Sequence, residues 1–186
     1  MNTQTTQARQ RVPSDEADRR QLEMARQEGA SYQRSLDYMV DEVAHTGARK
    51  QAGDYLVAIA QEEAEGMYRP NGDGELVWQE PDDENCHLEV SVSDAADRRF
   101  IPGLDIEATM TSEDGETVGP FSVPFLWHPG LYHYGINVKV PRDGKYGVKV
   151  RIASPQFARH DKTNGKRFAG PVEVEFSEVD VKTGQD

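Results

Sequence analysis

The stretch Cys86-His87-Leu88-Glu89-Val90-Ser91-Val92 alternates between apolar and polar side chains from its second residue onward. Because successive side chains of a β-strand leave opposite faces, the leucine and the two valines share one face. The histidine, the glutamate and the serine share the other face. The stretch therefore predicts a strand that turns one face to a hydrophobic core and presents two potential metal ligands, two positions apart, on the other.

The same period of two recurs along the chain from Asp54 onward. Further strands are expected near residues 55–60, 104–110, 133–138, 146–152 and 172–176. Turn signals such as Asn164-Gly165 separate these segments. Short strands at this spacing, with no helices between them, are typical of an antiparallel β-sandwich. We expect a mainly β fold, an immunoglobulin-like antiparallel β-sandwich over residues 52–180.

A single helix is expected before the sandwich. Residues 1–13 are polar and predict a disordered tail, and Ser14 is expected to be the N-cap of a helical extension over residues 14–47. An apolar stripe with steps of three and four predicts the buried face, and it includes Leu22, Tyr32, Leu36 and Val43. Such a helix must dock, either on its own β domain or on another subunit's helix. Residues 181–186 are expected to form a short tail.

The charge of the chain excludes several classes of partner. The formal net charge is -12 over 186 residues, which argues against nucleic acid and against an anionic membrane surface. Between Glu62 and Glu84, nine acidic residues face the single Arg69, a stretch that fits a solvated face, salt adaptation or attraction of cations. The chain also lacks an apolar run of transmembrane length, so no membrane insertion is expected.

The single cysteine and the N-terminal sequence bear on the compartment. A lone Cys86 excludes an intramolecular disulfide, and if its strand is regular its side chain points away from His87. The N-terminus has no hydrophobic segment of a secretory signal peptide. If Met1 is the native start, the protein is therefore expected to be cytoplasmic.

Four of the five histidines lie beside other potential metal ligands. They are His87, His128, His133 and His160, with Glu89 two residues after the first. Neutral imidazoles that converge from separate strands are the ligands that a transition-metal ion requires. Two interpretations remain open at this point, a shared metal site and a set of unrelated surface histidines. A metal site requires the imidazoles of His87, His133 and His160 to approach a common point.

Three short motifs, in order, resemble a known family. They are His87-Leu88-Glu89, His133-Tyr134-Gly135 and Phe157-Ala158-Arg159-His160-Asp161. The span from about residue 52 to 179 is similar to the Fe(II)-transport-protein family, bacterial metal-binding β-sandwiches associated with iron uptake that are usually periplasmic and dimeric. The resemblance implies that His87, Glu89, His133 and His160 bind a copper or iron ion.

The chain departs from that family at one position. The family supplies a methionine shortly before the His-Tyr-Gly triplet, whereas this chain has Pro124-Phe125-Leu126-Trp127-His128. We expect His128 to take the place of the methionine, which would favour Cu(II), Fe(II) or Zn(II) over Cu(I). Met67 could restore a sulfur ligand, or it could simply pack beside Tyr68. The predicted metal ligands are thus His87, Glu89, His128, His133 and His160.

The function expected from these residues is non-enzymatic. The chain has no GxSxG, P-loop or CxxC motif. We expect a protein that binds copper or iron for iron uptake, transfer or storage, as a homodimer and with a permease or another protein as a partner. Two alternatives stay open. One is a protein-interaction module that binds no metal, and the other is a weak Fe(II)-oxidising protein.

Overall fold

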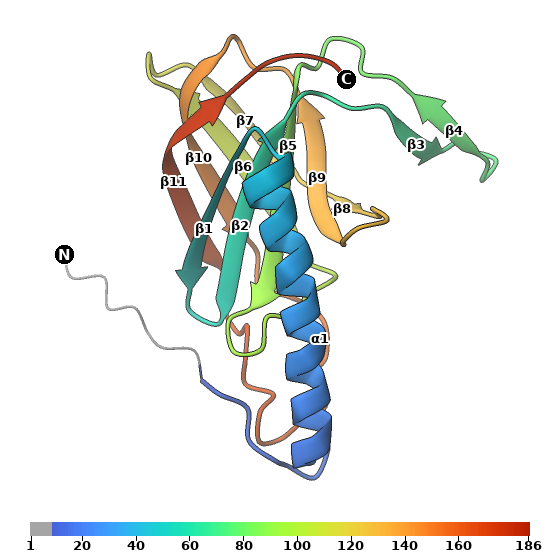
Figure 1. Cartoon of the computed structure of the whole chain (residues 1–186), viewed down its shortest axis with the longest axis vertical. Helices are drawn as coiled ribbons and strands as arrows, with labels where there is room; N and C mark the ends of the chain where they lie inside the picture. The colour runs from blue at the N-terminus through green and yellow to red at the C-terminus, as the bar shows by residue number, and fades with distance from the viewer. Residues whose placement is uncertain (1–8) are drawn as a thin grey trace.

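Two antiparallel sheets pack face to face in a computed structural model that describes residues 9–186 (Figure 1). The first sheet has five strands, in the order β1 (Thr46–Ala52), β2 (Tyr55–Glu62), β5 (Cys86–Asp94), β9 (His133–Val138) and β8 (Phe125–Leu126). The second has four strands, in the order β11 (Val172–Val181), β10 (Gly144–Ile152), β6 (Ile106–Ser112) and β7 (Thr117–Ser122). A separate hairpin is formed by β3 (Met67–Pro70) and β4 (Leu76–Gln79). The β-sandwich is confirmed, and the narrower immunoglobulin-like assignment stays a prediction.

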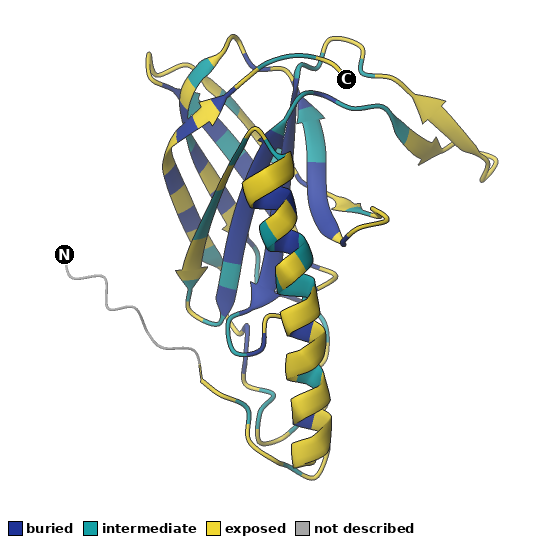
Figure 2. Cartoon of the chain, in the orientation of Figure 1, coloured by how far each residue is buried: buried dark blue, intermediate teal, exposed yellow. Residues whose placement is uncertain are grey.

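The hydrophobic core lies between the two sheets, as the alternation of buried and exposed residues along β10 and β11 shows (Figure 2). Strand β5 is central in its sheet, paired with β2 on one side and β9 on the other. Its residues Cys86, Leu88, Val90 and Val92 are fully buried in this core. The expectation that Cys86 points away from His87 is therefore confirmed.

The opposite face of the five-stranded sheet is covered as well. All nine residues of β5 are buried, including the polar ones. Helix α1 (Arg19–Tyr38) and the π-helix η1 (Met39–Val43) run across this outer face (Figure 1). Leu36 and Val40 belong to a small apolar cluster with Ala58 and Ala60 of β2. The helix therefore docks on its own β domain, which was one of the two options that the sequence left open.

The helix begins later than expected. Its N-cap is Asp18, which accepts a hydrogen bond from the Gln21 N–H while the Gln21 side chain bonds back to the Asp18 N–H. The predicted N-cap at Ser14 is wrong, because that hydroxyl belongs to a separate turn. It accepts from the Ala17 N–H at 3.2 Å and donates to Asp161 at 2.8 Å.

The helix also ends earlier than expected. The Ala44 N–H bonds to the Met39 carbonyl at 2.9 Å, the i to i+5 pattern of a π-turn, and β1 starts at Thr46. A π-turn shifts the side chains that follow it away from the stripe of an α-helix. Val43 is accordingly 55% exposed, so the prediction that it faces protein is wrong.

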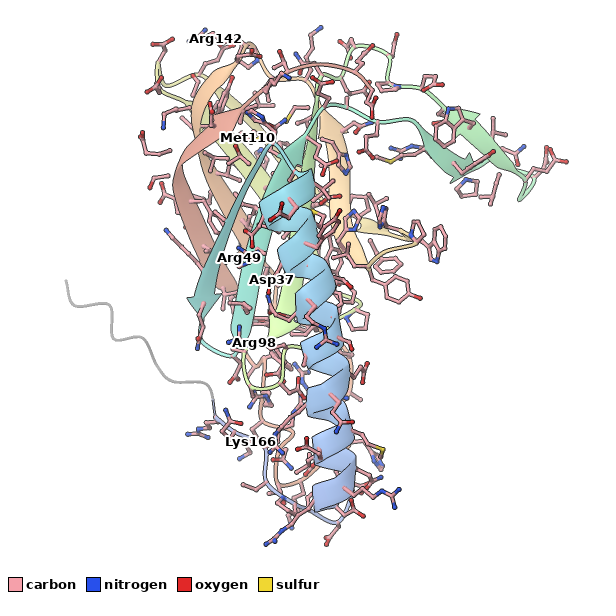
Figure 3. All side chains as sticks on the ribbon, in the orientation of Figure 1. Asp37, Arg49, Arg98, Met110, Arg142 and Lys166 are labelled. Carbon is pink, nitrogen blue, oxygen red and sulfur yellow. The ribbon has the colours of Figure 1, made fainter. Side chains whose placement is uncertain are left out.

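Two contacts fix α1 against the sandwich. Arg49 of β1 forms ion pairs with Asp37 and Asp41, both at 3.0 Å, and the first of these pairs can be followed in Figure 3. Further toward the start of the helix, Gly29 packs against the backbone of the turn after β5. A Cβ atom at this position would lie 1.7 Å from the Asp97 carbonyl oxygen. The ion pairs hold the end of α1 and η1 over the outer face of the sheet, and the close approach at Gly29 holds the middle of α1 against the turn after β5.

Both predicted tails contact the domain where they are described. Residues 1–8 of the expected disordered tail lie outside the described residues. In the remainder, Arg11 forms ion pairs with Asp94 and Asp97. At the other end, Ala64 forms a parallel bridge with Gln185, so the expected C-terminal tail lies along the sandwich.

Candidate metal centre

Three of the five predicted ligands meet on the outer face of the five-stranded sheet. His87 and Glu89 are alternate residues of β5, and His133 opens the neighbouring strand β9. One ligand atom from each of the three residues lies within 4.8 Å of the others. The Glu89 Oε1 atom is 3.1 Å from His133 Nε2 and 3.9 Å from His87 Nε2. The strand pairing thus brings together two imidazoles and a carboxylate, as the sequence predicted for these residues.

These three side chains are deeply buried, with exposed fractions of 1% for His87, 7% for Glu89 and 3% for His133. Surface histidines that merely face water do not have this environment. The interpretation as unrelated surface histidines is therefore wrong for His87 and His133. A buried polar group must find a partner or pay a large desolvation penalty, so the arrangement calls for a specific reason.

Asn137 fixes the orientation and the tautomer of His87. Its side-chain oxygen lies 2.8 Å from His87 Nδ1, and its amide group bonds both to the Glu65 N–H and, at 2.7 Å, to the Glu65 carbonyl. The Glu65 backbone therefore sets which end of the amide is oxygen. Since this oxygen only accepts hydrogen bonds, Nδ1 of His87 must carry the proton. The lone pair of His87 Nε2 is left free on the side of Glu89, as metal binding requires.

Gly135 provides the space for the His87 ring. In the register of β5 with β9, Gly135 lies directly opposite Glu89. A Cβ atom at this position would lie 3.0 Å from His87 Nε2 and 2.7 Å from a methyl carbon of Leu126. A larger residue here would press on the nitrogen that faces the site.

The buried groups of the site shift one another's pKa values. Burial alone would raise the pKa of Glu89, but the hydrogen bond from His133 and the nearby imidazoles hold it below its usual value. Burial lowers the pKa of His133, but its hydrogen bond with Glu89 and the charge of that group raise it above the ordinary value. Burial lowers the pKa of His87. Around neutral pH, Glu89 is thus an anion and His87 a neutral ligand.

One oxygen of Glu89 has no partner. Among the buried side-chain atoms without a hydrogen bond in residues 9–186, Glu89 Oε2 is the only carboxylate oxygen. A buried carboxylate normally accepts several hydrogen bonds or binds a cation. Together with the free Nε2 of His87, this unpaired oxygen fits a transition-metal ion bound by nitrogen and oxygen donors.

A cavity of about 440 Å³ lies over Glu89. Its walls come from the end of α1, from η1, from the end of β2 and from the loop before β9, and they include Met39, Glu62, Glu65 and His128. The pKa of Glu62 is raised to about 7, first by burial, then by its hydrogen bond with Glu65 and by the charge of Glu89. The cavity therefore presents several acidic groups to any ion that approaches the buried site.

His128 lies beside the site rather than in it. It is exposed, and its ring centre is 5.8 Å from that of His133. Its Nδ1 accepts a hydrogen bond from the Gly130 N–H at 3.0 Å, which leaves only Nε2 for another partner. His128 does not belong to the group of three ligands whose donor atoms meet. The structure therefore places it at the rim of the cavity.

His160 is not brought to the site within one chain. Its side chain is 92% exposed, and Nδ1 lies 3.0 Å from a carboxylate oxygen of Glu16. The loop that carries it follows β10 and lies beyond the ends of the strands, next to the first turns of α1 (Figure 1). The expectation that His160 approaches a common point with His87 and His133 is wrong for a single copy, because histidine spacing along the sequence carries no information about which end of a sandwich a loop occupies.

Two residues of the site were missed by the sequence analysis, namely Asn137 and Gly135. Both lie on the same face of β9 as His133, at intervals of two residues. The period of two that placed His87 beside Glu89 could have found them, because the polar face of this strand points at the same site.

A β-sandwich whose outer face holds a buried His–Glu–His group defines a class of small metal-binding proteins. Within that class, residues 38–182 match the model of a family described as Fe2+ transport protein. The chain belongs to this family, which connects it with metal binding and iron transport. The match begins at the last residue of α1, so the rest of this helix precedes the part that the family model covers.

Relatives of known sequence and structure agree with this assignment. A UPF0423 protein of Brucella abortus is 31% identical over 156 residues, covering 75% of this chain and 79% of the relative. Escherichia coli FetP is similar in structure, with a TM-score of 0.60 at 22% identity, covering 73% of this chain and 93% of FetP. A copper-bound variant of Campylobacter jejuni P19 has a TM-score of 0.61 at 18% identity, covering 74% of this chain and 96% of P19. No helix within residues 9–186 is long and apolar enough to cross a membrane.

Proposed function

We propose that this protein binds one transition-metal ion, copper or iron, through His87, Glu89 and His133, and holds it for transfer during iron uptake. The observation that carries the proposal is the buried His–Glu–His group with an unpaired carboxylate oxygen. Family membership and the copper-bound relatives FetP and P19 support it.

The donor set selects the class of ion. Two imidazoles and one carboxylate suit Cu(II), Fe(II) and Zn(II), whereas Mg²⁺ and Ca²⁺ prefer all-oxygen sites. Affinities should follow the usual order for divalent ions, with Cu(II) bound more tightly than Fe(II). Which ion occupies the site in the cell then depends on availability as well as on affinity.

The position of the site suits a carrier better than an enzyme. Three ligands leave coordination positions open, and the cavity over Glu89 gives an ion a way in and out. Glu62 and Glu65 line this path and attract cations. We therefore propose a non-enzymatic role, and adding Fe(II) in air should cause no oxygen consumption beyond that of a His133→Ala variant.

We propose a homodimer as the working form. His160 is almost fully exposed and pairs with Glu16, away from the His–Glu–His group of its own chain, so it would reach a metal site from a second copy. Two exposed aromatic residues, Trp127 and Tyr132, lie close to the site. Aromatic side chains are enriched at interfaces between protein chains, so this surface suits contact with a second copy. Sedimentation of the apo and metal-loaded protein tests this form.

A role in protein interaction is the second candidate, and it need not exclude the first. The β3–β4 hairpin projects from the sandwich and is exposed along its length (Figures 1 and 2). Tyr68 and Trp78 stack edge to face on it, with ring centres 5.0 Å apart. Because isolated hairpins are only marginally stable, this arm fits a partner such as a permease that receives the metal. Its removal should leave metal affinity unchanged and abolish that interaction.

The cellular location stays a prediction. The two candidates are the cytoplasm and the periplasm, and the relative FetP was expressed in the periplasm. Fractionation of the native host distinguishes the two.

Metal analysis of untagged protein tests the main proposal. We expect one copper ion per chain after incubation with Cu(II) and gel filtration. His133→Ala should lower the affinity for every ion, because it removes a direct ligand. His45→Ala is a matched control, since His45 lies away from the site and faces Asp180 at 3.8 Å. Equal metal content in the wild type and in His133→Ala would refute the proposal.

A further inference from the structure

The wall of the metal site beside His87 is formed by a side chain that cannot bind metal. Leu126 of β8 pairs directly with His133 of β9. One of its methyl carbons lies 2.7 Å from the point above Gly135 where a Cβ would stand, and His87 Nε2 lies 3.0 Å from the same point. Leu126 therefore lies next to both imidazole ligands, beside the nitrogen that we expect to face the ion.

Among the histidine, cysteine, aspartate and glutamate side chains of residues 9–186, the donors that meet at the site are two nitrogens and an oxygen. Cys86, the one cysteine, is buried in the core between the sheets. The Met67 sulfur lies beside the Arg69 guanidinium at 4.0 Å, on the projecting hairpin. Met39 lines the cavity over Glu89, within an apolar cluster. The position beside Gly135 and His87, where a soft donor would act most directly, is held by the aliphatic side chain of Leu126.

We propose that Leu126 determines the oxidation state of the ion that this site accepts, an inference that rests on the proposed function. With leucine at this position, the site offers only donors that suit Cu(II), Fe(II) and Zn(II). Cu(I) prefers thioether and thiolate sulfur, so it gains little here. Leu126 acts by excluding a sulfur donor and is not itself a ligand.

Substitution by methionine tests this reasoning with little change of shape. Leucine and methionine have similar volumes and usually exchange at small cost in stability. In Leu126→Met, the thioether should occupy the space above Gly135, near His87 Nε2, where a leucine methyl group now lies. Loss of a residue that only hydrogen-bonds to a metal ligand lowers metal affinity about 10- to 100-fold. The gain of a direct sulfur donor should therefore raise Cu(I) affinity by at least about tenfold.

His128→Met is the matched control. His128 precedes the same strand, but it is exposed and its ring lies at the rim of the cavity. A thioether there should change Cu(I) affinity much less than one at Leu126. This corrects the sequence-based expectation that His128 stands in the place of a sulfur ligand, because a methyl carbon of Leu126 and His87 Nε2 both lie within 3.0 Å of the same point above Gly135.

The experiment is a competition titration of wild type, Leu126→Met and His128→Met against chelators of Cu(I) and of Cu(II). We expect weak Cu(I) binding by the wild type, stronger Cu(I) binding only in Leu126→Met, and similar Cu(II) affinity in all three. X-ray absorption of the Cu(I) forms should show a sulfur neighbour at about 2.3 Å in Leu126→Met alone. Thermal unfolding of the apo proteins checks that each variant is folded.

Two results would overturn the inference while leaving the proposed function intact. One is tight Cu(I) binding by the wild type, particularly if Met39→Leu abolishes it. The other is unchanged Cu(I) affinity in a folded Leu126→Met variant. If that variant does not fold, Leu126→Cys replaces it. Unchanged Cu(I) affinity in Leu126→Cys would likewise overturn the inference. Failure of the wild type to bind any ion would instead refute the proposed function.

Discussion

Replacing Asn137 by alanine removes the group that orients His87. The side chain makes three hydrogen bonds, one with His87 Nδ1 and two with the backbone of Glu65. At about 0.5–1.5 kcal/mol each, these three bonds contribute about 1.5–4.5 kcal/mol to the free energy of unfolding. Because Asn137 is only half-buried, water should replace part of this contribution, and we expect a loss of about 2 kcal/mol.

Asn137→Ala should also weaken metal affinity, and by a larger factor than its loss of stability suggests. Without the acceptor at Asn137, the proton of His87 is no longer held on Nδ1, and the ring is free to turn. Loss of a residue that hydrogen-bonds to a metal ligand typically lowers metal affinity about 10- to 100-fold. We therefore expect Asn137→Ala to bind Cu(II) about 10- to 100-fold more weakly than the wild type.

Asn137→Asp is the control that separates orientation from stability. A carboxylate still accepts the His87 N–H, but it cannot donate to the Glu65 carbonyl. This variant should lose stability and yet keep the tautomer and the metal affinity of the wild type. Chelator competition measures affinity, urea unfolding measures stability, and ¹⁵N NMR of the histidine rings reports the tautomer. The reasoning fails if Asn137→Ala binds as well as the wild type, or if Asn137→Asp loses as much affinity as Asn137→Ala.

Three further predictions concern other parts of the chain. Gly29→Ala should lower the free energy of unfolding by about 1–3 kcal/mol in denaturant titrations, since its Cβ would overlap the Asp97 carbonyl, whereas Ala30→Ser on the exposed side should be neutral. The folded-state pKa of Glu62 is raised from 4.5 to about 7, so its contribution to apo stability is present below pH 4.5 and is lost as the pH rises through 7. Glu62→Gln should therefore flatten the dependence of Tm on pH between about pH 4.5 and 7. His160→Ala should leave metal affinity unchanged in dilute monomer, and an effect that appears only at concentrations where dimers form would place this residue in a shared site.

The strands could be predicted from the sequence wherever one face meets the core. In β5 the alternation correctly assigned Cys86 and Leu88 to the interior of the sandwich. In β1 (Thr46–Ala52) the sequence TGARKQA has no such alternation, because this edge strand is held by pairing with β2 rather than by burial of its side chains. The predicted helix consequently ran on to residue 47, where pairing of the strand overrides the local preference for helix.

The candidate site was predictable as far as strand geometry determines it. His87 and Glu89 lie on one strand, and the neighbouring strand brings His133 to them through register. His160 lies in a loop, and no periodicity relates a loop to a sheet face. The environment of His128 depends on a turn in which its own Nδ1 accepts from Gly130, a contact that the sequence does not indicate.

The burial of the site could not be predicted from the polar face of β5. His87, Glu89 and Ser91 are residues that usually face water, and they are buried because α1 and η1 cover this side of the sheet. Each polar side chain that the helices cover needs a hydrogen-bond partner. Tyr32 of α1 supplies one for Ser91, with the two hydroxyls 2.9 Å apart, and Asn137 supplies one for His87. Glu89 keeps one oxygen without a protein partner, and burial of an unpaired carboxylate oxygen is costly. This oxygen is therefore the atom to which the proposed metal ion would bind.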